Sequence, residues 1–555
     1  MSRDLLLSSM VLLAVAGCSG GAGIGDSCGG NDDCGGGLQC LNGLCAARCL
    51  RAPQCGDGYS CDASGLCIAS HAQAGDKCKS EVDCEAGLSC RINGAEVDSE
   101  NRLIASCAAE YSTGPAGAAC DVDSNCRNGT CEVGHCVDLC RQDRDCPVDF
   151  SCMTIPRVAM NGAQFAGCLP TQATLSWDIP VTSPSAQVAL PVPAGALSAE
   201  LVMSVDDPTQ EVGATGVLDP CGCTSYQVPC PFGPTPDGGA CTAAVANDQF
   251  YSRPGIAAGG GSGSGASNTI CTSNPCSDLG NPPANRVRHR PGLGRSVLLM
   301  PSIPGDGEIK GGAYLIRVSS FWPDGSPGSA VPHIRAVVRL GAASPLDLHF
   351  FFLDLSDHPC VAMTGGATLD AAGAQQPGSA FQGMFLGELA SVFLRVNLKL
   401  GALTYADIAD RHDLDSLDVA NVGSLLALGS YPSGVNVFFI RSLSPLGLTA
   451  FSPSPGPAGV AGSPESGIVI ALDTLCYRDW TAVARLAAHE IARYMGLYHN
   501  VEPRDPAQTA GDPPWQDLIE DSDTSSANLM YFSEPTGIEL SAGQRDALGR
   551  SAVMR

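Results

Sequence analysis

The chain has 555 residues and a net charge of -26, from 31 Lys and Arg against 57 Asp and Glu. This acidity argues against nucleic acid and against anionic membrane surfaces as partners, because both need a basic footprint on the protein. The length predicts roughly three to four domains. The 66 Gly and 39 Pro favour loops and short strands over long helices.

The N-terminus has the pattern of an export signal. An apolar run over 5–16 follows Arg3 and is too short to span a bilayer as a helix. The run ends in the letters VAGC, which resemble the lipobox of bacterial lipoproteins. The resemblance implies a lipoprotein signal peptide over 1–17, with Cys18 as the lipidated first residue of the mature chain. The alternative is an ordinary signal peptide that happens to precede a cysteine.

The residue after the lipidated cysteine indicates the destination. Ser19 resembles the residue that directs lipoproteins to the outer membrane in bacteria that use this rule. We therefore expect an exported protein at the bacterial outer membrane or cell surface, which contacts the membrane through its N-terminal lipid anchor only. In that oxidising compartment the cysteines other than Cys18 should form disulfides.

Residues 25–168 contain five copies of a four-cysteine unit, within a cysteine-rich disulfide region that we place at 18–169. In four units Asp or Asn precedes the second cysteine, and Gln54 departs from this pattern. Each unit is too small for a hydrophobic core, so disulfides must supply its stability. Four cysteines allow three connectivities, among which the sequence does not choose. The five sets are Cys28/Cys34/Cys40/Cys45, Cys49/Cys55/Cys61/Cys67, Cys78/Cys84/Cys90/Cys107, Cys120/Cys126/Cys131/Cys136 and Cys140/Cys146/Cys152/Cys168.

The spacing of this array resembles the Dickkopf-like or EGF-like modules of bacterial surface lipoproteins. The resemblance implies a stalk or an adhesive module. Zinc bound by the paired cysteines is the alternative, and the oxidising compartment disfavours it.

Apolar and polar residues begin to alternate after Pro170. Leu175, Trp177 and Ile179 share one face of a predicted strand. Antiparallel strands without helices predict a β-sandwich over 170–341, which is reminiscent of the jelly-roll accessory domains of secreted proteases. A Cys- and Gly-rich insertion at 218–292 indicates a flexible loop. Further strands are expected at 199–205, 297–300, 313–318 and 334–340.

From residue 342 the pattern changes to alternating strands and helices, which predicts an α/β (α+β) domain over 342–555. The longest predicted helix runs from Asp479 to Met495 and stops at Gly496. Cys360 and Cys476 are the only cysteines of this region and are candidates for one bridge. Strands are expected at 346–353, 396–405, 435–440 and 467–472, and another helix at 381–396.

The longest helix leads into residues 489–499, HEIARYMGLYH, and the letters NLMY follow at 528–531. Together they resemble the H-E-x-x-H-x-x-G-x-x-H motif and the Met-turn of the metzincin zinc proteases. The resemblance covers 342–555. It implies zinc ligands at His489 and His499, a general base at Glu490, a turn at Gly496 and the Met-turn methionine at Met530. The strand at Gly467–Leu472 lies where the family places the edge strand that binds extended substrate.

One departure from the family bears directly on chemistry. Arg493 occupies the position of the second histidine ligand, and a guanidinium has no lone pair to give a metal. Arg493 could instead pair with Glu490, three residues earlier on the helix. A carboxylate from the acidic stretch 512–523, such as Asp517 or Asp521, could replace the missing ligand.

Two functions follow from these observations. The first is a cell-surface lipoprotein with a metzincin-like zinc metallopeptidase domain, in which zinc on His489 and His499 polarises the peptide carbonyl and Glu490 takes a proton from water. Its substrates would be extracellular proteins or peptides. The alternative is an inactive pseudo-metalloprotease, in which Arg493 has abolished metal binding and the chain acts as a surface binding or adhesion module.

Overall fold

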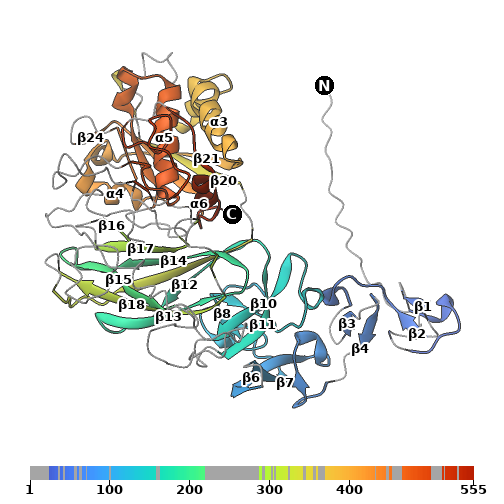
Figure 1. The fold of residues 1–555 in the computed structure, drawn as a ribbon. Helices are drawn as coiled ribbons and strands as arrows, with labels where there is room; N and C mark the ends of the chain where they lie inside the picture. Colours follow the sequence, from blue (N-terminus) through green and yellow to red (C-terminus); the bar gives the residue numbers. More distant parts are fainter. Residues whose placement is uncertain are drawn as a thin grey trace, which may run out of the picture.

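The computed structural model describes residues 24–554, apart from 219–286, 361–368, 453–465, 502–515 and shorter stretches of about one to five residues. The predicted signal peptide, Cys18 and most of the insertion at 218–292 lie outside the described residues. The described chain forms a disulfide-rich N-terminal part, a middle part of antiparallel sheets and a C-terminal part with helices (Figure 1). In the part of the chain that the structure describes, no helix is both long and apolar enough to cross a membrane.

The five cysteine units, numbered here 1 to 5 in chain order, share one connectivity. In each, the first cysteine is bridged to the third and the second to the fourth, over Cα–Cα distances of 5.2–6.0 Å. The disulfide prediction is confirmed for these cysteines. The bridges are Cys28–Cys40, Cys34–Cys45, Cys49–Cys61, Cys55–Cys67, Cys78–Cys90, Cys84–Cys107, Cys120–Cys131, Cys126–Cys136, Cys140–Cys152 and Cys146–Cys168.

Each unit is a short 3-10 turn followed by a hairpin. The turns are η1 (Asn31–Asp33), η2 (Ala52–Cys55), η3 (Glu81–Asp83), η4 (Asp123–Asn125) and η5 (Asp143–Asp145). The hairpins are β1 (Gln39–Leu41) with β2 (Leu44–Ala46), β3 (Tyr59–Cys61) with β4 (Cys67–Ala69), β6 (Leu88–Val97) with β7 (Leu103–Ala109), β8 (Cys131–Glu132) with β9 (His135–Cys136), and β10 (Phe150–Arg157) with β11 (Ala163–Pro170). In unit 3 the strand β5 (Lys77–Cys78) adds to β7.

The residue before the second cysteine closes the 3-10 turn by accepting backbone N–H groups. Asp83 accepts from the amides four and three residues earlier at 2.9 and 3.1 Å, and Asn125 does so at 3.1 and 3.2 Å. Gln54, the departure noted in the sequence, accepts from the same two positions at 2.6 and 3.1 Å. The repeated residue is therefore a side-chain cap of the turn, and a glutamine oxygen serves as well as a carboxylate.

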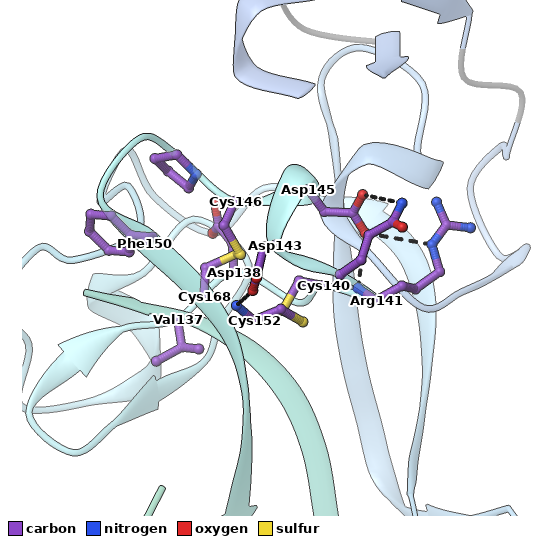
Figure 2. Close-up of a disulfide and its surroundings, with 12 residues drawn as sticks. Val137, Asp138, Cys140, Arg141, Asp143, Asp145, Cys146, Phe150, Cys152 and Cys168 are labelled. Atoms are coloured by element: carbon purple, nitrogen blue, oxygen red, sulfur yellow. Dashed lines mark hydrogen bonds and ion pairs between the residues drawn. A yellow bond between two sulfur atoms is a disulfide. The ribbon is translucent and has the colours of Figure 1, made fainter. Parts of the chain in front are cut away.

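Unit 5 shows how such a turn is tied to the rest of its unit (Figure 2). Asp145 accepts the amide of Arg141 at 2.9 Å and is itself buried. Asp143, at the start of the same turn, accepts the amide of Cys152 at 2.9 Å and so links the turn to the hairpin. These carboxylates replace the packing that so small a unit cannot provide.

Replacing Asp145 with Ala should destabilise unit 5 by about 1–3 kcal/mol, because the amide of Arg141 then loses its acceptor. Asp145→Asn should stay close to the wild type, since Asn125 performs the same role in unit 4. Denaturant unfolding of the oxidised protein, with hydrogen exchange at the Arg141 amide, measures both variants. Equal losses for Ala and Asn would contradict this role of the side chain.

The middle part consists of two antiparallel sheets that pack face to face (Figure 1). Their apolar side chains form one core, which also includes Ile155 and Leu169 of unit 5. Units 3 to 5 are thus built onto this part rather than projecting from it as a separate stalk. One sheet has the order β12 (Ala173–Ile179), β19 (His333–Leu340), β14 (Ala196–Ser204), β17 (Arg295–Met300), β16 (Val287–Arg290), and the other β13 (Ser185–Val192), β18 (Gly312–Phe321), β15 (Glu211–Leu218).

The C-terminal part contains a five-stranded sheet in which four strands are parallel and the edge strand β25 is antiparallel. The order is β21 (Leu400–Ile408), β20 (Leu346–Leu353), β23 (Val435–Ile440), β26 (Ile468–Ala471), β25 (Ala450–Phe451). A separate pair of parallel strands is formed by β22 (Ser416–Asp418) and β24 (Ser442–Ser444). The helical segments are α2 (Ala371–Ala374), η10 (Phe381–Leu386), α3 (Gly387–Arg395), η11 (His412–Leu414), η12 (Val419–Asn421), α4 (Gly423–Leu426), η13 (Leu472–Cys476), α5 (Trp480–Tyr494) and α6 (Ala542–Gly549).

The structure corrects the predicted substrate edge at Gly467–Leu472. Strand β26 lies inside the sheet, between β23 and β25, and all four of its residues are buried. Strand β25 was not predicted, because two residues, Ala450 and Phe451, carry no periodicity that a sequence can reveal. The backbone edge on this side of the sheet therefore belongs to β25.

The end of the chain joins the C-terminal part to the middle part. The fully buried guanidinium of Arg339 on β19 donates to the carbonyl oxygens of Ser551, at 3.2 Å, and Met554. Thr174 on β12 donates to Met554 O at 3.3 Å, while Val553 O accepts from the amide of Gly434 at 2.9 Å. The tail is thus bonded to both parts at once.

Arg339→Met should destabilise this junction by about 3 kcal/mol, because carbonyl groups of the buried tail lose their charged donor. Burial lowers the pKa of Arg339 to about 10, so its charge is still present at neutral pH. Arg335→Met is the control: it lies on the same strand, and its ion pair with Asp178 at 3.4 Å is exposed and worth less than about 1 kcal/mol. Urea unfolding separates the two expectations, and similar losses would refute the assigned role.

Candidate functional site

Helix α5 places the motif residues in the core of the C-terminal part. Asp479 caps its N-terminus by accepting the amide of Ala482 at 2.9 Å. Apolar residues at helical spacing, including Val483, Ala487 and Ile491, bury one face. The helix therefore begins and ends close to the predicted limits, and His489 and Glu490 come to lie in its buried last turns.

The structure brings His489 and His499 together. Their ring centroids lie 5.2 Å apart with an angle of 29° between the planes, and both side chains are buried. Nδ1 of His489 lies 2.7 Å from the carbonyl oxygen of Leu529 and donates to it, so Nε2 carries the lone pair. A backbone carbonyl on the second ring nitrogen is the usual way in which a protein orients a histidine ligand.

The electrostatics of this pair keep His489 neutral. Its complete burial, followed by the charges of His499 and Arg493, lowers its pKa well below the ordinary value. The hydrogen bond with Leu529 O opposes this shift without reversing it. Arg493 thus lies close enough to the imidazole for its charge to act there.

The turn at residues 528–531 lies directly against the two histidines. Met530 is fully buried, and its amide donates to Oδ1 of Asn528 at 2.9 Å. Its carbonyl accepts the amide of Asn500, the residue after His499, at 3.0 Å. Asn500 in turn donates its side-chain N–H to Asp523 O at 2.6 Å. The sequence indicated Met530 but not Asn500, whose only signal is its position next to the last histidine.

Gly496 turns the chain between the two histidines. Its φ of +115° lies in the left-handed region, which favours glycine. A Cβ at this position would also lie 3.0 Å from Cδ2 of Leu299 on β17, in the neighbouring sheet. The predicted turn is therefore present, and it is pressed against the middle part of the molecule.

Gly496→Ala should destabilise the protein by about 1–3 kcal/mol through backbone strain and the contact with Leu299. Gly549→Ala is the matched control: it lies at the end of α6, nothing is within 4 Å of its added Cβ, and the change should be neutral or stabilising by about 1 kcal/mol. Thermal unfolding of both variants provides the comparison. A neutral result at Gly496 would contradict the strain.

Glu490 is buried beside His489, and its Oε2 has no hydrogen-bond partner among the residues that the structure describes. A buried carboxylate oxygen without a donor is costly, so it marks a position where a cation or a donor would be favourable. A general base in the predicted reaction would need a carboxylate oxygen that is similarly available to accept a proton.

The described residues do not complete a metal site of three protein ligands. Among them, the only groups of three or more possible ligand atoms within 4.8 Å of one another are cysteines of the disulfide units. Arg493 occupies the position that the resemblance predicted for a second histidine ligand. Its charge opposes a divalent cation, so the donor set around His489 and His499 does not fit zinc.

The two aspartates considered as replacement ligands have other partners. Asp517 accepts from the amide of Ile519 and from Gln544, both at 3.4 Å, and burial raises its pKa to about 7. Asp521 accepts the amide of Gly543 at the start of α6. Neither joins His489 in a ligand group, and residue 512 at the start of the acidic stretch lies outside the described residues.

A disulfide fixes the approach to the motif helix. Cys360 and Cys476 are bonded, as the sequence suggested, across a sequence separation of 116 residues. The bridge ties the segment after β20 to the end of η13, four residues before Trp480 begins α5. It restrains the chain on which the motif depends.

No protein-family model matches this chain, and no curated protein sequence matches it. The assignment of a function therefore depends on the chemistry of the residues themselves.

Proposed function

We propose that the chain is an exported surface lipoprotein, anchored at Cys18, whose C-terminal part is a metzincin-like domain that has become a non-catalytic binding module. In this proposal the domain keeps the scaffold of a metallopeptidase and recognises an extracellular protein or peptide without cleaving it. The disulfide-rich units extend the contact surface.

The observation that carries the proposal is the donor set at His489 and His499. No third ligand atom joins them among the described residues, and Arg493 brings a positive charge where a ligand is needed. A guanidinium stays protonated and cannot coordinate a metal. Two imidazoles beside a fixed cation are a poor site for zinc, which in catalytic sites takes three protein ligands and a water.

Three features support a metallopeptidase scaffold as its origin. The strand, helix and strand order leads to a motif helix, α5, and then to a buried methionine turn at Met530. His489 keeps the carbonyl partner that orients a ligand histidine. Gly496 keeps the turn that brings His499 back to the helix.

A working zinc peptidase is the second candidate, and the unpartnered Oε2 of Glu490 favours it. In that case His489 and His499 would hold the zinc with a further ligand, and zinc would supply Lewis acidity and an acidic water. Glu490 would hold the proton taken from that water at its carboxylate.

Metal content of the whole oxidised protein distinguishes the two candidates. The wild type should contain far less than one zinc per chain after dialysis against zinc, whereas Arg493→His should approach one, because the third ligand is restored. Mass spectrometry of the intact complex and elemental analysis measure this. Whole protein is used because the tail of the C-terminal part is bonded to Arg339.

Ala482→His serves as the control for adding a histidine to the same helix. Ala482 lies in the first turn of α5, seven residues and roughly 10 Å along the helix axis before His489, so the variant should bind no zinc. Stoichiometric zinc in the wild type, together with cleavage of a peptide library that is lost in Glu490→Gln, would overturn the proposal and establish the peptidase.

A further inference from the structure

Unit 4 of the disulfide array contacts each of its two neighbouring units through an arginine that lies between two carboxylates. The Arg127 triad consists of Arg127, Glu81 and Asp138 and connects unit 4 to unit 3. The Arg157 triad consists of Arg157, Asp123 and Glu132 and connects it to unit 5. Two separate joints of one chain thus have the same composition, with one positive charge for two acids.

In the Arg127 triad, Arg127 lies 2.8 Å from Oδ2 of Asp138 and 3.6 Å from Oε1 of Glu81. The other oxygen of Glu81 accepts the amide of Cys90 at 3.0 Å, and the amide of Glu81 donates to Leu139 O at 2.8 Å. Glu81 is therefore tied to its own hairpin and to the linker between units 4 and 5. A change in its charge acts directly on the joint.

The surroundings of Glu81 are strongly acidic. A cavity of about 220 Å³ lies between the units and is lined by all three residues of the Arg127 triad. Among the described residues that line it, Arg127 is the only basic one, and Arg141 outside the cavity pairs with Asp145 at 3.6 Å. The acidic residues that line it are Glu81, Glu85, Glu110, Asp138 and Asp145. Arg127 faces both Glu81 and Asp138, so retention of a proton by one of these two buried acids is favoured.

The Arg157 triad also sets two acids against one arginine, but only Glu132 is buried, because the side chain of Asp123 is 49% exposed. The side chain of Arg157 is 6% exposed and that of Glu132 12%, and they lie 3.1 Å apart. Asp123 completes the triad from η4. The groove of about 1000 Å³ beside it contains three further charged groups, and two of these, Arg335 and Asp178, pair with each other. The third is Asp121.

We infer that the two triads are joints that tighten in acid, so that units 3 to 5 are held together more firmly in acidic than in alkaline surroundings. Acidification neutralises the surplus carboxylate in each triad and leaves one arginine with one carboxylate. Alkaline conditions leave two anions against one cation in each triad, and the excess negative charge weakens the contact between the units.

The direction in which the stability of the joints changes with pH follows from proton linkage. Burial, followed by the charge of Asp138, raises the pKa of Glu81 from 4.5 to about 8, although Arg127 opposes the shift. Burial raises the pKa of Glu132 from 4.5 to about 7, against Arg157. Between 4.5 and these values the folded array holds protons that the unfolded chain has released. Stability of the joints therefore falls as pH rises through this window.

Hydrogen exchange of the whole oxidised protein tests the inference. At about pH 5 the protection factors of peptides covering Glu81 and Cys90 should exceed those at about pH 8 by tenfold or more, after correction for the intrinsic exchange rate. The double variant Glu81→Gln/Glu132→Gln should keep its acid-state protection at the higher pH. Gln keeps a carbonyl oxygen for the Cys90 amide and carries no charge.

The matched control is Glu96→Gln, an exposed glutamate of β6 in unit 3. It should show the same loss of protection with pH as the wild type. Wild-type protection that does not change with pH would overturn the inference. The inference would also be overturned if the double variant lost as much protection between about pH 5 and about pH 8 as Glu96→Gln does.

Discussion

The relation between the parts of this molecule depends on one buried cation. Arg339 lies in the middle part with almost no exposure, and its guanidinium holds the carbonyl groups of the last residues of the chain. Because that tail also bonds to Gly434 at the start of β23, the sheet that carries the motif helix is fixed to the sheet beneath it. Gly496 then approaches Leu299 closely, so the geometry between His489 and His499 is set partly by the neighbouring part.

Under the proposed function, this arrangement explains how a metallopeptidase-like scaffold could persist without catalysis. The carbonyl of Leu529 accepts from His489, the amide of Asn500 donates to the carbonyl of Met530, and the Met530 side chain is buried. None of these contacts needs a metal. In that proposal, Arg493 at the position of a ligand removes metal coordination and leaves the packing intact. Stability and activity are then separable, because the contacts that fix the fold are made by groups other than the ligand atoms.

Much of the architecture follows from the sequence, and the differences have identifiable causes. The limits of β20 and β23 match the predicted strands because both are dominated by apolar residues, with polar residues only at Asp347, His349 and Asn436. The predicted strand at 396–405 begins later, at Leu400, because Val396 ends α3 and Asn397 adopts a positive φ of 61°. The short edge β25 carries too few residues for a periodic signal.

The sequence also predicted the candidate site only where its residues form a local motif, and missed contacts between residues that are far apart in the chain. The motif indicated His489, His499, Glu490 and Met530, and the structure brings the two histidines together and packs the methionine turn against them. The sequence did not indicate Asn500 or the acidic triads of the array, because their partners lie far apart in the chain. The connectivity of the disulfides was likewise open, since spacing alone permits three pairings.

The interlaced bridges have a further consequence for a protein that meets proteases. Because Cys78 pairs with Cys90 and Cys84 with Cys107, at least one bridge spans every peptide bond between the first and the last cysteine of the unit. A protease that cuts once inside a unit therefore leaves both pieces tethered. Side-by-side bridges would leave the segment between them unprotected. The array can be nicked repeatedly, once in each of its five units, and still remain attached to the rest of the molecule.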